Sequence, residues 1–342
     1  MVSARKLIKA FMALLTLLAL SGCQTVSFYT QGVVGHSQLM LARQPVDKVL
    51  KTADTELADK LTLTKELKEF AIRELALPDN KSYSTYVPLN REYPVWVVVA
   101  ASQLSLEPKQ WCYLIIGCAS YRGYFSKSSA YEYAAKLKEQ DWEVYVGGAA
   151  AYSTLGWFAD PLLPTMMRGD DSALAELIFH ELAHQKLYVK GDSEFNESMA
   201  TVVGERGALR WLKQQRPNSV KRYQGQLQAQ RQFSELVTNL KRILNQIYKS
   251  DADLDKKLAF KRNEIQAFRS DYEKLKSVEW SGRGYFDNWI SSEINNAKLA
   301  SFSTYYARAP EFNLFLDECN GDFWRFFASL EDNKGVIPKA CK

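Results

Sequence analysis

Histidine is scarce in this chain, with three in 342 residues, and its five cysteines include no CxxC pair. The missing pair argues against a zinc module built from thiolates. Clustered basic motifs are also missing, and leaving out Arg5, Lys6 and Lys9 of the leader lowers the formal charge from +5 to +2, so no nucleic-acid partner is expected. Long repeats and low-complexity tracts are absent. A hydrophobic content of 46% and a charged content of 24% are those of a globular chain long enough for a sizeable core.

The N-terminus reads MVSARKLIKAFMALLTLLALSGCQT, a basic start followed by an apolar run (residues 11–20) and then by small residues. This order is typical of an export signal, and the run is too short to cross a bilayer comfortably. The sequence LSGC at 20–23 resembles the bacterial lipobox, in which cleavage precedes a cysteine that becomes lipidated. The resemblance implies a signal peptide over 1–22 and lipidation of Cys23. Gln24 then favours an outer-membrane anchor facing the periplasm; a plain secretory signal is the alternative.

Export into an oxidising compartment favours disulfides among the remaining cysteines, which are even in number. They are Cys112, Cys118, Cys319 and Cys341. Sequence proximity favours the pairs Cys112–Cys118 and Cys319–Cys341, although four cysteines permit three pairings.

Hydrophobic patterning divides the rest of the chain into helical and strand-rich stretches. Leucines at helical spacings predict two helices between residues 24 and 78, broken near Gln44-Pro45. β-branched and aromatic residues predict strands over about 83–152, with a serine-capped helix at 126–140 between them. Gly147-Gly148 is interpreted as a bulge or turn within this region.

A charged segment with one apolar stripe, residues 220–278, predicts an antiparallel helical hairpin that breaks at Ser250-Asp251. The hairpin is either an arm packed on the core or an arm that binds a protein partner. The remaining chain is again helical. The expected fold class is therefore α+β: a single, mainly helical domain over 23–342 with a small mixed β-sheet and the hairpin as an insertion.

The stretch LIFHELAHQKLYVKGDSEFNESMA (177–200) holds two of the three histidines. Asp170, Asp171 and Ser172 are cap candidates before an apolar-periodic run, which predicts a buried helix. His180 and His184 lie one turn apart on the same face, where two imidazoles can hold one zinc ion.

Glu181 stands beside the first histidine and can act as general base toward an attacking water. Buried histidines and a glutamate would be costly without partners. The alternatives are a core helix whose histidines bond backbone carbonyls and a closed structural zinc site.

A catalytic zinc needs a third protein ligand and an open position. His36, the remaining histidine, is far away in sequence, so we expect a carboxylate from a second helix. Glu197 is the preferred ligand, because it could point back toward the two histidines. Glu194 is the nearest rival and Glu205 a weaker one.

HELAH followed by Asn-Glu-x-x-Ala resembles the gluzincin class of metallopeptidases. More closely, the chain resembles a bacterial lipoprotein family assigned as zinc aminopeptidases, from the lipobox to the C-terminus. The resemblance rests on CASYRGYF (118–125), AAYSTLGWFADPLL (150–163) and FHELAHQ (179–185).

This resemblance implies a zincin-like fold with one Zn²⁺ bound by His180, His184 and Glu197, and water activation by Glu181. The aminopeptidase assignment identifies peptidase chemistry better than exopeptidase specificity.

Supporting roles in substrate binding and catalysis have several candidates. By analogy with zincins, residues 151–161 would bind the substrate backbone at a sheet edge, or would be a core strand and loop. Asp160 or Glu194 would receive a free amine. The candidates for substrate binding and for stabilising the oxyanion are Tyr121, Arg122, Tyr305 and Tyr306.

The expected protein is a membrane-anchored zinc aminopeptidase of the bacterial envelope. One alternative is an endopeptidase acting on envelope proteins or on peptidoglycan peptides. The other is a non-catalytic scaffold or chaperone lipoprotein that binds its partner through the 220–278 hairpin.

Overall fold

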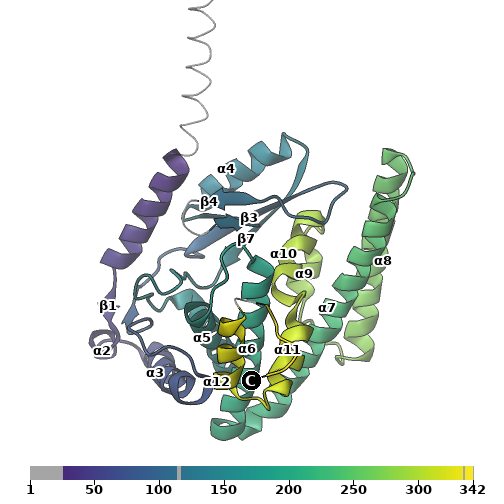
Figure 1. Cartoon of the computed structure of the whole chain (residues 1–342). Helices are drawn as coiled ribbons and strands as arrows, with labels where there is room; N and C mark the ends of the chain where they lie inside the picture. The colour runs from purple at the N-terminus through teal and green to yellow at the C-terminus, as the bar shows by residue number, and fades with distance from the viewer. Residues whose placement is uncertain (1–25, 114–116, 334–335, 342) are drawn as a thin grey trace, which may run out of the picture.

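Figure 1 shows the computed structural model of the chain, which describes residues 26–113, 117–333 and 336–341. The expected leader and Cys23 lie outside these residues. An N-terminal helix (residues 26–41) comes first. The helices after it are α2 (Val46–Val49), α3 (Thr55–Leu75), α4 (Lys127–Lys138), α5 (Asp171–Lys186), α6 (Ser193–Gln215), α7 (Val220–Tyr248), α8 (Leu254–Val278), α9 (Asp287–Ser291), α10 (Asn296–Tyr306), α11 (Ala309–Glu318) and α12 (Phe323–Asp332).

Within the described residues the strands are few and short, and they form three small sheets. They are β1 (Gln44–Pro45), β2 (Thr85–Tyr86), β3 (Val95–Ser102), β4 (Trp111–Tyr113), β5 (Gly117–Ala119), β6 (Arg122–Tyr124) and β7 (Trp142–Ala149). The mainly helical α+β class expected from the sequence is therefore confirmed.

The main sheet has the strand order β6-β3-β7, and both of its ladders are antiparallel. The expectation of a mixed sheet was wrong. The reason is that α4 connects β6 to β7 across β3. These two strands run in the same direction but are not neighbours, and each pairs with the antiparallel strand between them.

The two faces of β3 have different surroundings, because side chains alternate along a strand. Trp96, Val98 and Ala100 pack under α4 in one hydrophobic cluster. The odd-numbered residues Val95, Val97 and Val99 point the other way, toward the HELAH helix, and line a cavity described below. Figure 1 shows α4 above the sheet, and α5 and α6 below it.

Gly147 and Gly148 lie inside the continuous β3–β7 ladder, opposite Val97 and Trp96. Their interpretation as a bulge or turn was therefore wrong. The absence of a side chain at Gly148 makes room for the ring of Tyr93, since a Cβ there would lie 2.1 Å from the ring.

Helices α5 and α6 form the centre of the main core, and each begins at an aspartate cap. Asp170 accepts a hydrogen bond from the backbone N–H of Ala173, and Asp192 accepts one from that of Phe195. The side chains that these two helices contribute to the core include Leu174, Ile178, Phe179, Met199, Val202 and Val203.

The helical hairpin predicted over 220–278 is confirmed, with α7 and α8 joined by residues 249–253. Its inner face belongs to a second hydrophobic cluster that includes residues of α9 and α10, such as Ile290 and Leu299. Among the described residues, no helix has both the length and the apolar character that crossing a bilayer requires.

The four cysteines among the described residues form two disulfides, and each joins the two that are closest in sequence. Cys112 and Cys118 face each other across the β4–β5 ladder. Cys319, directly after α11, bonds to Cys341 near the C-terminus.

Candidate metal and catalytic site

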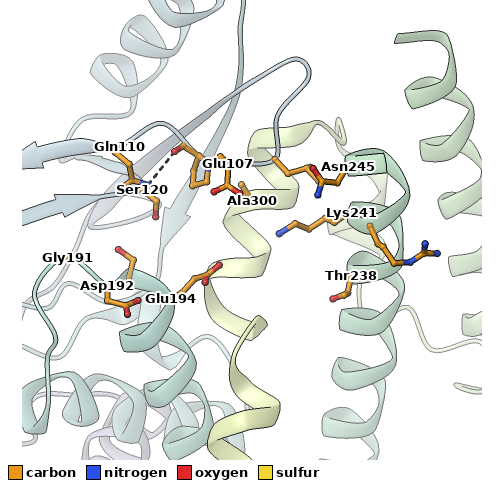
Figure 2. Close-up of a pocket in the computed structure, with 14 residues that line it drawn as sticks. Glu107, Gln110, Ser120, Gly191, Asp192, Glu194, Thr238, Lys241, Asn245 and Ala300 are labelled. Atoms are coloured by element: carbon orange, nitrogen blue, oxygen red, sulfur yellow. Dashed lines mark hydrogen bonds between the residues drawn. The ribbon is translucent and has the colours of Figure 1, made fainter. Parts of the chain in front are cut away.

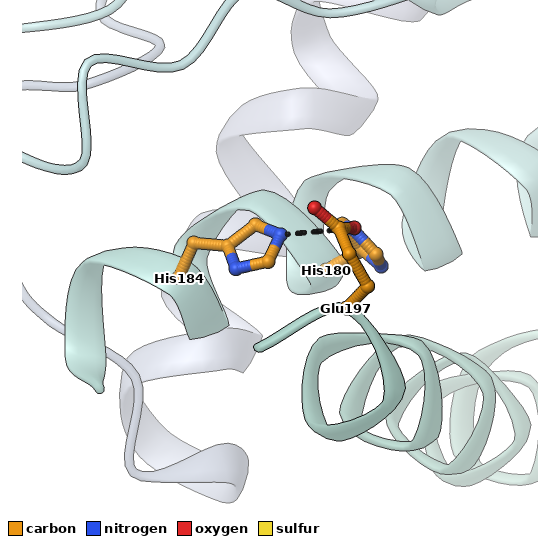
Figure 3. A group of neighbouring side chains, drawn as sticks. All are labelled: His180, His184 and Glu197. Carbon is orange, nitrogen blue, oxygen red and sulfur yellow. Dashed lines mark hydrogen bonds and ion pairs between the residues drawn. The ribbon is translucent and has the colours of Figure 1, made fainter. Parts of the chain in front are cut away.

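Three side chains from two helices point toward one another (Figure 3). The Nε2 atoms of His180 and His184 on α5 lie 3.1 Å apart. Oε2 of Glu197 on α6 lies 3.3 Å from Nε2 of His180 and 3.5 Å from Nε2 of His184. One potential ligand atom from each side chain thus lies within 4.8 Å of the other two.

This donor set fits a metal ion. Ligand atoms held about 2.0–2.1 Å from a tetrahedral zinc lie roughly 3.3 Å apart, close to the three observed separations. Nδ1 of His184 is buried and has no hydrogen-bond partner among the described residues, so the imidazole is not explained as a core group bonded to a backbone carbonyl. His180, His184 and Glu197, together called the metal group below, could therefore hold a metal ion.

A close approach of the two helices brings Glu197 to the histidines. A Cβ at Gly204 would lie 2.7 Å from the backbone oxygen of Glu176 and 3.3 Å from Cβ of His180. Gly204 follows Glu197 by seven residues, so both lie on the same side of α6. A larger residue there would separate the helices that carry the two parts of the metal group.

The charges of the group depend on one another. Burial raises the pKa of Glu197, but the charge of His184 and hydrogen bonds from both histidines outweigh it, and the pKa lies well below its usual value. Burial lowers the pKa of His184, yet the Glu197 carboxylate outweighs burial and raises it. A carboxylate that stays ionised between two imidazoles is suited to binding a cation.

Glu181, between the two histidines in sequence, lines the same cavity. Burial raises the pKa of its carboxyl group, and the two histidines partly offset this effect. Ser153, from the loop after β7, also acts to lower this pKa. A carboxyl group with a raised pKa beside a metal group has the properties of a general base.

Three tyrosines surround the metal group and line the cavity: Tyr121, Tyr188 and Tyr305. The ring of Tyr305 lies 6.2 Å from that of His180, centroid to centroid, at an interplanar angle of 28°. The Glu197 carboxylate raises the pKa of Tyr305 well above its usual value. Its hydroxyl therefore remains a hydrogen-bond donor at neutral pH. Tyr188 was not a candidate in the sequence analysis; it lies just after the end of α5, where the chain is no longer helical.

Arg122 is not part of this site, so its assignment to substrate binding was wrong. It pairs with Val98 in the β3–β6 ladder, on the face of the sheet that packs under α4. Its guanidinium group lies 3.9 Å from the centroid of the Phe28 ring and 4.5 Å from that of Tyr133. Strand alternation turns this side chain away from the metal group.

Asp160 is fully buried and is not available to bind a free amine, which corrects its assignment to substrate binding. It accepts hydrogen bonds from the backbone N–H and hydroxyl of Thr154, and a longer one of 3.3 Å from Gln185. Burial raises its pKa to about 6. Asp160 thus closes the loop that follows β7, and residues 150–158 form no strand that could present a free sheet edge.

The two rival ligands lie elsewhere. Glu194 is exposed on the first turn of α6 and lines a second cavity. Glu205 is half-buried near Glu176, and desolvation and that neighbouring carboxylate raise its pKa to about 8. His36 bonds the hydroxyl of Tyr152 at 3.0 Å and does not join the metal group.

Two adjacent cavities lie in this part of the molecule. The larger one, of about 790 Å³, is lined by all three residues of the metal group and extends from them beneath the sheet, toward the N-terminal helix. A second cavity, of about 500 Å³, lies between the first turn of α6 and the hairpin helix α7 (Figure 2). Pro108 and Ser120 line both, so the two cavities are adjacent.

Comparison with known proteins places this architecture in a family. No match to the chain was found among curated proteins or among solved structures. A family model described as "Putative aminopeptidase" matches residues 27–339, which include both helices of the metal group, the sheet and the hairpin. Membership of such a family supports peptidase chemistry in general. The chain belongs to the "Putative aminopeptidase" family.

Proposed function

We propose that this protein is a zinc metallopeptidase that cleaves peptide bonds as an aminopeptidase, held in the bacterial cell envelope by a lipid on Cys23. One observation carries the proposal: two histidines of an HExxH helix and a glutamate from a second helix form a group that could hold a metal ion, with Glu181 between the histidines. The family match adds independent support for peptidase chemistry.

Each residue of the site has a defined role in this proposal. His180, His184 and Glu197 bind the ion, and a set of two imidazoles and one carboxylate suits zinc. Zn²⁺, when bound, supplies a Lewis acid that polarises the scissile carbonyl and makes water a better nucleophile. Glu181 takes the proton from the attacking water and passes it to the leaving amine.

The developing oxyanion needs a hydrogen-bond donor. Tyr305 and Tyr121 both line the cavity at the metal group, and both have raised pKa values, so they keep their protons. We assign the donor role to Tyr305, whose ring stacks on that of His180. Tyr121 is the second choice.

An endopeptidase is the second candidate, and the two adjoining cavities favour it. A peptide could extend on both sides of the metal group rather than end beside it. Hydrolysis of matched peptides with free and with acetylated N-termini separates the two activities. An aminopeptidase cleaves only the free form.

The central test compares the full chain, loaded with zinc, with Glu181→Gln and Glu197→Gln. We expect one zinc per molecule in the parent, an unchanged zinc content in Glu181→Gln with a loss of turnover of at least about a hundredfold, and much less zinc in Glu197→Gln. Retained turnover in Glu181→Gln would reject the mechanism. Mass spectrometry of the mature N-terminus, beside Cys23→Ser, tests the lipid anchor.

A further inference from the structure

The larger cavity has walls from three distant parts of the chain. The N-terminal helix contributes Phe28 and Val33, and strand β3 contributes Val95 and Val97. The loop after β7 contributes residues 151–158. The cavity ends at the metal group, so a peptide bound for cleavage would have part of its length in this space. Its volume of about 790 Å³ is within the range of ordinary ligand sites.

The lining of this cavity is almost entirely uncharged. Among the described residues, its only carboxylates are Glu181 and Glu197, both at the metal end, and no lysine, arginine or aspartate lines it. The walls away from the metal group are mostly valine, alanine and aromatic side chains. A charged group entering here would lose water without gaining a partner, whereas an apolar side chain would gain from burial.

The nearby sheet edge is already occupied, which limits how a peptide can bind. Gln31 of the N-terminal helix donates from Nε2 to the backbone oxygen of Gly123 at 3.3 Å. Its Oε1 accepts from the backbone N–H of Phe125 at 3.0 Å. The side chain thus takes the main-chain positions that an added strand would use at β6. A substrate backbone therefore cannot add as a strand at β6, and side chains supply the recognition at this edge.

The neighbouring cavity has the opposite chemistry (Figure 2). Its lining includes the carboxylates Glu107, Asp192 and Glu194, as well as Lys241 and Arg242. Burial lowers the pKa of Lys241, while the charges of Glu194 and Glu107 act to raise it. Charged groups of both signs therefore line the cavity that adjoins the apolar one at Pro108 and Ser120.

We infer that the substrate is a peptide of asymmetric character. On one side of the cleaved bond it carries apolar side chains that fill the cavity beneath the sheet, and on the other side polar or charged side chains that enter the cavity beside α7. This inference rests on the proposed peptidase function and names the substrate class for the same site.

The first experiment reads the cleavage sites directly. The full chain, in lipid nanodiscs so that no free detergent competes for the cavity, is loaded with zinc and given a mixture of random decapeptides. Mass spectrometry of the products should show leucine, isoleucine, valine and phenylalanine enriched on one side of the cut, by about fivefold or more over the other side. Equal frequencies on both sides would refute the inference and leave the peptidase function intact.

The second experiment measures binding without turnover. Zinc-loaded Glu181→Gln is titrated with two labelled decapeptides that differ only in a central block of leucines or serines. We expect the leucine peptide to bind at least about tenfold more tightly. Equal affinities would overturn the inference even if no peptide is cleaved. Tighter binding of a long-chain fatty acid than of the leucine peptide would overturn it in favour of an acyl ligand.

Two matched substitutions locate the binding to the cavity. Val97→Thr places a hydroxyl in the cavity wall, and Val146→Thr makes the same change on the opposite face of the sheet, where Val146 packs toward α4. We expect Val97→Thr to weaken binding of the leucine peptide by about fivefold or more and Val146→Thr to leave it unchanged. Equal effects of the two would show that the cavity is not the binding site. Thermal unfolding of the two variants checks that each is folded.

Discussion

The substitution Gly204→Ala tests whether the close approach of α5 and α6 creates the metal group. The added Cβ would lie 2.7 Å from the backbone oxygen of Glu176. Carbon–oxygen contacts ordinarily begin at roughly 3.3 Å, so the helices must separate by about 0.6 Å. Metal–ligand distances tolerate about 0.2 Å. Because Glu197 lies on one helix and His180 on the other, the separation acts directly on the ligand distances.

We therefore expect Gly204→Ala to lower zinc affinity by roughly 10- to 100-fold, the usual effect of disturbing the support of a metal site. Overpacking costs about 1–3 kcal/mol, while alanine gains about 1 kcal/mol of helix propensity over glycine, so the net loss of stability is on the order of 1 kcal/mol. Competition with a fluorescent zinc chelator measures the affinity, and urea unfolding measures the stability.

Gly225→Ala on α7 is the matched control, because nothing lies within 4 Å of a Cβ at that position. It should raise stability by about 0.5–1 kcal/mol and leave zinc affinity unchanged. If Gly204→Ala bound zinc as tightly as the parent and gained the same stability as Gly225→Ala, the close helix contact would have no part in forming the site.

Three further predictions concern single residues. Tyr305→Phe should lower kcat by about 10²–10³-fold with zinc content unchanged, and Tyr306→Phe should not; equal kcat values for the two variants would remove Tyr305 from the mechanism. Breaking Cys319–Cys341 with Cys341→Ser should cost about 3 kcal/mol in urea unfolding, because the bond closes a loop of sequence separation 22; a change below 1 kcal/mol would contradict this. Burial raises the pKa of Asp160 from 3.8 to about 6, so the native state holds this proton more tightly than the unfolded chain does. The stability of the parent relative to Asp160→Asn should fall as the pH rises from about 4 to about 6 and stay level above, and a pH-independent difference would refute the assignment.

The parts that local sequence could predict are those set by neighbours along the chain. The aspartate at 170 and the apolar run after it place the start of α5, and the four-residue spacing places His180 and His184 on one face. The break at Ser250-Asp251 falls in the turn between α7 and α8. Helix capping, helical periodicity and turn formation depend on residues a few positions apart, so they can be recognised from local sequence.

The parts that failed depend on contacts between distant residues. The pairing of Arg122 with Val98 decides on which face of the sheet its side chain lies. A shift of one residue in this register would place the side chain on the opposite face. Asp160 is recognisable as a loop anchor only once Gln185, 25 residues later, lies beside it. The contact of Gln31 with β6 joins residues 92 positions apart, so no local sequence pattern predicts it.

The contact between Gln31 and β6 also limits how far the catalytic centre can travel. If Cys23 carries the lipid, two residues separate it from the start of the helix at Val26, so the span is at most about 10 Å. The helix itself, 26–41, adds roughly 24 Å. Because this helix is a wall of the cavity, the peptidase could not swing outward on a flexible stalk. The catalytic centre would stay within a few tens of ångströms of the bilayer surface. Only substrates that come within this distance could be cleaved, whatever their sequence.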